Sequence, residues 1–192
     1  MIKETLLVST FGLLGLVTVA CGSQKKDQTA EAVSETAWCL DGFERPTGVN
    51  PVIKPLPTKF YCPMREDSVA WEESDTFNPA ATIYDGKIVV KYRAEDNSAQ
   101  GIGSRTSRLG YATSTDGIHF ERDTKPAFYP AKDNQVENEC PGGTEDPRIA
   151  MTEDGTYVLL YTQWNRKVPR LAVATSKDLK HWTKFGPAFE KA

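Results

Sequence analysis

The sequence has little histidine and no marked excess of either charge. Lys and Arg number 23 against 26 Asp and Glu, the net charge is −3, and there are 2 histidines. Nucleic-acid-binding chains usually show a basic excess, and zinc sites need clustered Cys and His ligands. Because the chain has no basic excess, we expect no nucleic-acid partner. It has no Cys-x-x-Cys motif and no His cluster, so we expect no metal site, and we expect no cofactor.

Long apolar runs are also absent, except for one at the start of the chain. Residues 5–20 are almost wholly apolar, follow a charged start and are too short for a typical membrane span. Cys21 follows directly and resembles the lipidated cysteine of a bacterial lipobox. We expect residues 1–20 to be a lipoprotein signal peptide, Cys21 to carry the lipid and residues 21–37 to form a disordered tether. The protein would then be exported and membrane-anchored, in the periplasm or at the cell surface. The alternative is a plain signal peptide or an N-terminal anchor.

The remaining cysteines are few. Cys39 and Cys62 flank a proline-rich segment and could pair as a disulfide in an oxidising compartment, which would leave Cys140 unpaired. Neither His119 nor His181 lies near Cys140 in the sequence, so a nucleophilic role for this thiol is not favoured. The two histidines precede an aromatic residue at matching places, and we expect them to pack on strands rather than to catalyse.

The chain contains an internal repeat. Residues 78–92 and 146–161 share one order: a polar residue, proline, an apolar strand, an Asp-Gly turn, a second apolar strand and tyrosine. Asp-Gly between two such runs is a strong hairpin signal, because the turn needs positive φ. The likeness continues downstream, where residues 109–120 match 171–182. We therefore predict that each repeat unit contains about four short strands.

Four-stranded units that recur after roughly 60 to 70 residues are typical of a β-propeller. We place the blades at about 75–129 and 146–189, within a propeller domain that covers 38–192. A propeller needs roughly four to eight blades, so we expect the chain to be an N-terminal portion of a longer protein. A small sandwich of about eight strands is the alternative.

Charged and polar residues gather at the predicted strand ends. Asn78 and Asp146 hold equivalent positions at the start of the first strand of each unit, where a propeller lines its channel. The other candidates at strand ends are Arg93, Glu95, Asp96, Arg108, Glu145, Arg148, Asn165 and Arg166. Arginine forks suit a hydroxyl-rich or phosphate-bearing ligand, and Tyr92, Tyr161 and Trp164 could stack on sugar faces. A set of rim salt bridges is the alternative.

Four short motifs together resemble glycoside hydrolase family 130. They are Asn-Pro-Ala-Ala at 78–81, Tyr-Arg-Ala-Glu-Asp at 92–96, Ser-Arg-Leu-Gly at 107–110 and Glu-Asp-Pro-Arg at 145–148. The resemblance extends from about residue 76 to the C-terminus. It implies an all-β, five-bladed propeller, of which this chain holds about the first two blades, and an enzyme that cleaves β-mannosidic bonds with inversion.

The resemblance also implies roles for individual residues. Asp146 matches the general acid that protonates the departing glycosidic oxygen, and Asn78 matches a residue that holds the adjoining sugar. Arg93 matches an arginine that helps to bind the attacking phosphate. The remaining candidates Asp96, Arg108, Glu145, Arg148, Asn165 and Arg166 are expected to bind substrate, a β-mannoside oligosaccharide.

Two reactions stay open. Phosphorolysis would use inorganic phosphate as co-substrate and release α-mannose 1-phosphate, and Arg93 favours it because a bound anionic nucleophile needs positioning rather than deprotonation. Hydrolysis is favoured by the leader, since a sugar phosphate made outside the cytoplasm is hard to recover. A non-catalytic glycan-binding lipoprotein, or an inactive propeller fragment, is the alternative to an enzyme.

Overall fold

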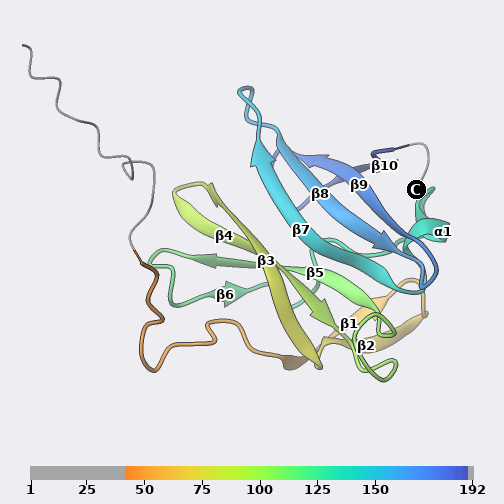
Figure 1. The fold of residues 1–192 in the computed structure, drawn as a ribbon, viewed down its shortest axis with the longest axis horizontal. Helices are drawn as coiled ribbons and strands as arrows, with labels where there is room; N and C mark the ends of the chain where they lie inside the picture. The colour runs from red at the N-terminus through yellow and green to blue at the C-terminus, as the bar shows by residue number, and fades with distance from the viewer. Residues whose placement is uncertain (1–41, 190–192) are drawn as a thin grey trace, which may run out of the picture. The chain divides into compact units, whose positions relative to one another are not determined.

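The computed structural model describes residues 42–189, which are almost entirely strands and loops (Figure 1). The strands are β1 (Leu56–Cys62), β2 (Asp67–Glu72), β3 (Asp75–Tyr84), β4 (Lys87–Glu95), β5 (Ser107–Ser114), β6 (Glu121–Arg122), β7 (Gly143–Met151), β8 (Tyr157–Trp164), β9 (Pro169–Ser176) and β10 (Thr183–Pro187). One short helix, α1 (Val136–Glu139), lies between β6 and β7. The prediction of an all-β fold is confirmed.

Several predictions fall on residues that the structure does not describe. The signal peptide at 1–20, the lipidated Cys21, the tether at 21–37 and the Cys39 end of the proposed disulfide all lie outside residues 42–189. Within that range, Cys62 and Cys140 are free thiols. Over the same residues, no helix is both long enough and apolar enough to cross a membrane.

Two antiparallel groups of four strands form the main sheet. The first unit is β3-β4-β5-β6 and the second is β7-β8-β9-β10. A single parallel bridge between Ser107 and Gly143 joins them, and β3 also contacts β7 (Figure 1). The first unit begins at Asp75 and the second at Gly143, three residues before the expected Asp146. The sheet is open, so five-bladed closure stays a prediction.

Each first strand is interrupted by a β-bulge at the same repeat position. The pairing of β3 with β4 shifts between Phe77 and Ala80, and that of β7 with β8 shifts between Glu145 and Arg148. The bulges contain Asn78 and Asp146, whose φ angles are 44° and 48°. A bulge turns a side chain out of the regular alternation of a strand. The side chains of Asn78 and Asp146 therefore do not follow the alternating directions of the other side chains in β3 and β7.

Tyr92 and Tyr161, which lie in the second strand of each unit, are buried. In the first unit Tyr92 donates to Glu72 at 2.8 Å, and Arg122 lies 3.1 Å from the same carboxylate. In the second unit Tyr161 donates to Glu139 at 2.8 Å, and Lys184 lies 2.5 Å away. These buried contacts hold β2 against the first unit and α1 against the second. Because Tyr92 is 2% exposed and Tyr161 is 0% exposed, the prediction that they stack on sugars is wrong.

The two histidines also differ from the expectation. The side chains of His119 and His181 are 84% and 90% exposed, so a strand-packing role is wrong. Each ring nitrogen Nδ1 lies within hydrogen-bond distance of an aspartate three residues earlier, at 2.7 Å from Asp116 and 2.6 Å from Asp178. These aspartates also accept backbone N–H groups of the same loops. Asp116 with His119, and Asp178 with His181, therefore stabilise equivalent surface loops in the two units.

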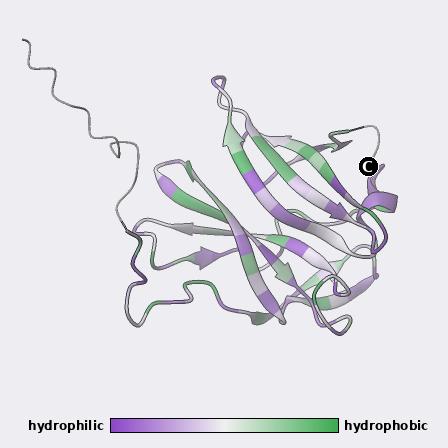
Figure 2. Ribbon diagram, viewed as in Figure 1, coloured by the Kyte–Doolittle hydropathy of each residue, from purple (hydrophilic) through white to green (hydrophobic). Residues whose placement is uncertain are grey.

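Figure 2 shows that the hydrophobic residues of β7 and β8 lie toward the turn that joins these strands, whereas their polar residues lie toward the opposite ends. The hairpin β1–β2 packs Phe60 and Trp71 onto the first unit, against Val90 and Tyr92. A second apolar cluster joins the two units through residues of both: Val89, Tyr111, Tyr157 and Leu179. Burial of these side chains is what holds the two units against each other and so keeps β3 beside β7.

Candidate active site

The two bulges bring Asn78 and Asp146 into contact. The Asn78 amide nitrogen donates to Asp146 Oδ1 at 2.8 Å, although the residues are 68 positions apart in the chain. The Asp146 side chain is 37% exposed, so its carboxylate is open to a ligand. The equivalence of these two positions in the repeat therefore becomes direct contact in space.

Arg93 is the centre of a polar cluster beside this pair. Its Nη1 donates to Asp146 Oδ1 at 3.1 Å, and its Nη2 donates to Glu95 at 2.6 Å and to Glu145 at 2.8 Å. Its Nε donates to Ser107 Oγ at 3.1 Å. The side chain is 5% exposed. Three carboxylates thus share one guanidinium, and protein groups occupy at least four of its five N–H donors.

A close approach of β5 and β7 makes this cluster possible. Gly143 has φ 117°, and a Cβ at this position would lie 2.1 Å from the Ser107 carbonyl oxygen. Only glycine therefore allows the two strands to bridge here. The contact places Ser107 Oγ 3.0 Å from Glu145 Oε1. Burial raises the pKa of Glu145, with Arg93 opposing the shift.

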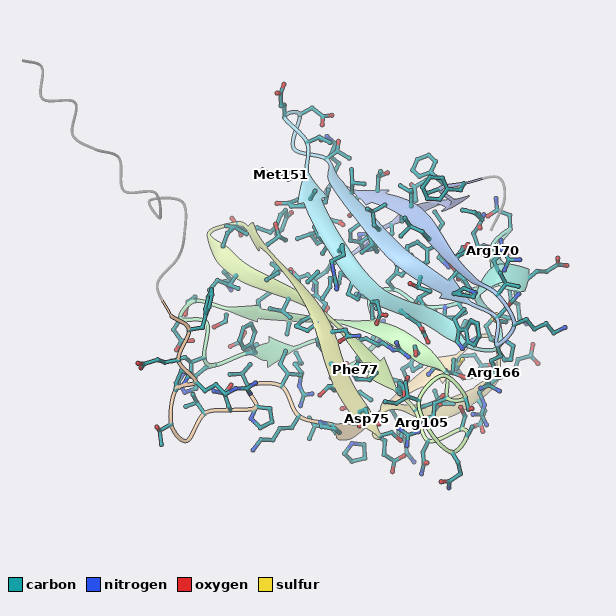
Figure 3. All side chains as sticks on the ribbon, viewed as in Figure 1. Asp75, Phe77, Arg105, Met151, Arg166 and Arg170 are labelled. Carbon is teal, nitrogen blue, oxygen red and sulfur yellow. The ribbon has the colours of Figure 1, made fainter. Side chains whose placement is uncertain are left out.

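The rim of the cluster is formed by a loop that the repeat does not predict. Arg105 bonds Asp75, and its Nη1 lies 3.5 Å from Glu95 Oε2. The ring of Phe77 lies over Arg93, 4.7 Å from the guanidinium carbon. Figure 3 shows Asp75, Phe77 and Arg105 at the same end of the first unit. We did not predict Arg105, because its loop has no counterpart in the second unit.

Two predicted site residues form a separate buried pair. Arg108 Nη1 lies 2.9 Å from Asp96 Oδ2, and their side chains are 1% and 3% exposed. Burial opposes ionisation of Asp96, but Arg108 and the hydrogen bonds of Ser98 together outweigh it, and the pKa of Asp96 is lowered. Arg108 Nη2 also lies 3.7 Å from Cys62 Sγ. Among the described residues, no hydrogen bond links this pair to Asp146, so the structure does not bring it into the cluster.

The other predicted residues lie on the surface. Arg148 is exposed and donates to the neighbouring Pro147 carbonyl at 2.7 Å. Asn165 accepts the N–H groups of Lys167 and Val168 and so shapes the turn between β8 and β9. Arg166 is exposed on the same turn, and Figure 3 shows it beyond the end of β8. None of the three reaches the Asp146 cluster through a hydrogen bond within residues 42–189.

Trp164 differs from the two buried tyrosines. Its Nε1 donates to the Gly103 carbonyl at 2.7 Å, which ties the loop between β4 and β5 to the second unit. The side chain is half-buried, so one of the three predicted aromatic surfaces stays accessible. Over the part of the chain that the structure describes, no group of three or more His, Cys, Asp or Glu side chains is placed to hold a metal ion.

Comparison with known proteins supplies independent information. A family model for glycoside hydrolase family 130, described as beta-1,4-mannooligosaccharide phosphorylase, matches residues 51–192. A 1,2-beta-oligomannan phosphorylase of Thermoanaerobacter is 38% identical over 125 residues, which cover 63% of this chain and 40% of that protein. The chain thus spans well under half the length of this relative.

Solved structures are more similar still. A candidate glycoside hydrolase from Parabacteroides distasonis is 99% identical, with a TM-score of 0.80 over 83% of this chain and 46% of that one. Another structure is 68% identical, with a TM-score of 0.78 over 81% of this chain and 44% of that one. It was solved in work on family 130 mannoside phosphorylases, which found glycoside hydrolases among them that target β-1,2 mannosidic linkages in Candida mannan.

Proposed function

The chain belongs to glycoside hydrolase family 130, and from this premise we propose that the protein cleaves β-mannosidic bonds with Asp146 as general acid. The observation that carries the proposal is the setting of Asp146. Its carboxylate is partly exposed, sits on a bulge with positive φ and is held by both Asn78 and Arg93. Unusual backbone conformations cluster at active sites, where surrounding contacts hold them.

The geometry supports distinct tasks for the three residues. Asp146, in its protonated form, would give its proton to the glycosidic oxygen as the bond to the leaving sugar breaks and water bonds to the anomeric carbon. The attacking water gives up a proton to solvent, and Asp146 regains one for the next turnover. Asn78 and Arg93 both donate to Oδ1, which leaves Oδ2 as the oxygen with which Asp146 can protonate the substrate. Glu95 and Glu145 are buried, so Asp146 is the solvent-accessible carboxylate of this cluster.

The same contacts give Arg93 a task other than phosphate binding. At least four of its N–H groups are already donated to the protein, and three carboxylates surround it. A phosphate dianion would have to displace them and approach their negative charge. We therefore assign Arg93 the positioning of Asp146.

We propose hydrolysis, with β-1,2-linked mannosides as substrates, as the reaction. The support is the 68% identity to the structure whose work describes hydrolases of β-1,2 mannosidic linkages, against 38% identity to the phosphorylase. Export, predicted from residues 1–20, would agree with a reaction that forms no sugar phosphate. Phosphorolysis is the second candidate, favoured by the description of the family model.

The test uses the full reading frame that contains this chain, expressed without residues 1–20. β-1,2-mannobiose and β-1,4-mannobiose are each incubated with and without inorganic phosphate. Hydrolysis predicts free mannose at the same rate with or without phosphate, and preference for the β-1,2 linkage. Mannose 1-phosphate formed only with phosphate would replace hydrolysis by phosphorolysis.

Two variants separate catalysis from folding. Asp146→Asn keeps the size of the side chain but removes the acid, and we expect product formation to fall by about a thousandfold or more. Asp85→Asn is the matched control, because Asp85 lies in an exposed Asp-Gly turn at the far end of β3 and asparagine tolerates its φ of 49°. Full activity of Asp146→Asn, or no product from the unmodified protein, would leave glycan binding as the better account.

A further inference from the structure

Glu95 and Glu145 share the same two hydrogen-bond partners. Arg93 Nη2 lies 2.6 Å from Glu95 Oε1 and 2.8 Å from Glu145 Oε1. Ser107 Oγ lies 3.2 Å and 3.0 Å from the same two oxygens. Two oxygens that share both partners must lie close together. Two ionised carboxylates so placed repel each other, and the usual outcome is that one keeps a proton.

The number of hydrogens at the cluster favours the same outcome. Arg93 Nη2 has two hydrogens, one for each carboxylate, but Ser107 has a single hydroxyl hydrogen. Ser107 can therefore donate to Glu95 or to Glu145, not to both, while it accepts from Arg93 Nε. One of the two contacts with Ser107 would then join two lone pairs. A proton on one carboxyl converts that contact into a hydrogen bond.

The charges around the pair decide which carboxyl holds the proton. Glu95 is paired with Arg93 and also faces Arg105, whose Nη1 lies 3.5 Å from its Oε2. Among residues 42–189, Arg93 is the only cation paired with Glu145. Asp146 adds a negative charge next to Glu145 in the chain and competes for the same guanidinium. Glu145 is thus the less compensated of the two.

We propose that Glu145 is a positioning residue that carries a proton at neutral pH, so that the charge of Arg93 is shared by Glu95 and Asp146 alone. The neutral carboxyl donates to Ser107 Oγ or to Glu95 Oε1 and accepts from Arg93 Nη2. Burial, the largest influence, raises the pKa of Glu145, and Asp146 and Glu95 add to the rise, whereas Arg93 and Ser107 oppose it. The direction agrees with the geometry.

The catalytic consequence rests on the proposed function. When Glu145 loses its proton, a third anion competes for Arg93, and the contact between Arg93 Nη1 and Asp146 weakens. Activity should then decline on the alkaline side as Glu145 ionises. Glu145 acts through Arg93 and does not touch the substrate in this account.

A first test needs no catalytic activity. Infrared difference spectra at pH 7, recorded on the full protein against Glu145→Gln, should show the carbonyl band of a protonated carboxyl that the variant lacks. The difference is needed because burial also raises the pKa of Glu139. Glu139→Gln is the matched control and should retain the band of Glu145, because Glu139 bonds Tyr161 and Lys184 outside the cluster. Absence of any protonated carboxyl band from the unmodified protein at pH 7 would overturn the proposal, whatever the variants do.

Thermal unfolding supplies a second test. The pKa of Glu145 is raised above its ordinary value of 4.5, so the folded protein holds this proton more tightly than the unfolded chain. The resulting stabilisation is complete below the unfolded pKa and is lost as pH rises through the folded pKa. The Tm of Glu145→Gln relative to the unmodified protein should therefore rise with pH above about 4.5. A difference that is constant with pH would contradict a proton on Glu145.

Kinetics separate positioning from a purely structural role. The pH profile of kcat should lose its alkaline decline in Glu145→Gln, because an amide cannot ionise. Glu95→Gln should lower kcat at all pH values, because it removes the anion that holds Arg93. An alkaline decline that persists in Glu145→Gln would show that another group is responsible for it, and the assignment would be wrong. If the unmodified protein is inactive, the proposed function fails, while the spectral and thermal tests still decide the protonation.

Discussion

The Asn78 amide lies 2.8 Å from Asp146 Oδ1, and both residues stand before a proline at the bulge of the first strand of their unit. Two equivalent positions of the repeat are thus in contact, one with an amide side chain and the other with a carboxylate. An amide can donate to a carboxylate, whereas a second aspartate would repel it. Asn78 therefore holds one oxygen of Asp146 without adding charge.

Replacing Asn78 by glycine should lower kcat/KM by about tenfold to a hundredfold, because Asp146 Oδ1 loses one of its two donors and its orientation loosens. Glycine adopts a φ of 44° without strain, so the Tm should change little. Asn78→Ala removes the same amide but adds strain, and it should lower both kcat/KM and Tm. Unchanged kcat/KM in Asn78→Gly would show that the hydrogen bond is not what positions Asp146. Equal Tm losses in the two variants would show that backbone strain does not explain the loss in Asn78→Ala.

Arg93→Met should destabilise the protein by about 3–5 kcal/mol, because removal of one partner leaves buried carboxylates without a cation. Arg93 is 4% exposed and pairs with Glu95, Glu145 and Asp146. Urea unfolding at pH 8 measures the loss. At pH 5 the loss should be smaller, since carboxylates left without a cation take up protons more readily there and repel each other less.

Arg93→Lys is the matched variant for this prediction. Lysine keeps the positive charge but not the planar fork that reaches four acceptors. The stability of Arg93→Lys should therefore lie between that of the unmodified protein and that of Arg93→Met. A loss below about 1 kcal/mol in Arg93→Met, or no dependence on pH, would mean that the carboxylates find another partner.

Lys91 is a buried amine between the two units, and its replacement by methionine should stabilise the protein. Its Nζ has no hydrogen-bond partner in the described part of the chain and lies 5.4 Å and 5.3 Å from the ring centres of Tyr111 and Trp182. Burial lowers the pKa of Lys91 to about 7 from 10.5. The unfolded chain therefore binds this proton more tightly between these two pH values, and stability contributed by Lys91 falls as pH falls.

The Tm of Lys91→Met relative to the unmodified protein should thus increase from about pH 10 to pH 7 and then level off. Lys180→Met provides the contrast, because Lys180 lies 4.5 Å from the ring centre of Tyr111 but bonds Asp123 near the surface. A hydrogen bond with Asp123 raises the pKa of Lys180. Its replacement should give no such increase. The same pH trend in both variants would contradict a specific effect of burial.

The repeat in the sequence predicts the fold of each unit well, because hairpins depend on neighbouring residues. The Asp-Gly turns and the apolar runs on either side of them lie in the hairpins β3–β4 and β7–β8, and the shared polar-proline pattern marks the bulges that contain Asn78 and Asp146. Tyr92 and Tyr161 show the limit of such reasoning. Whether they face the core depends on Glu72 and Glu139, which come from segments outside the repeat.

The polar cluster could be predicted only in part. Arg93, Glu145 and Asp146 were recognisable by their motifs, but their mutual contact depends on the bridge between β5 and β7. That bridge joins two units through Ser107, and no periodic pattern indicates which side chains will meet across it. Arg105 reaches the rim from a loop of the first unit alone.

Gly143→Ala should be among the most damaging single substitutions in the chain. The added Cβ would lie 2.1 Å from the Ser107 carbonyl oxygen, and the φ of 117° is itself unfavourable for alanine. We expect a loss of about 3 kcal/mol or more, measured by urea unfolding, and loss of activity with it, since β5 and β7 must separate and Ser107 leaves Glu145.

Gly155→Ala is the control: its φ is 73° and nothing lies within 4 Å of the new atom, so only about 1–2 kcal/mol of backbone strain should appear. Similar losses in the two variants would show that the strands can move apart without cost, and that the close bridge does not hold the cluster together.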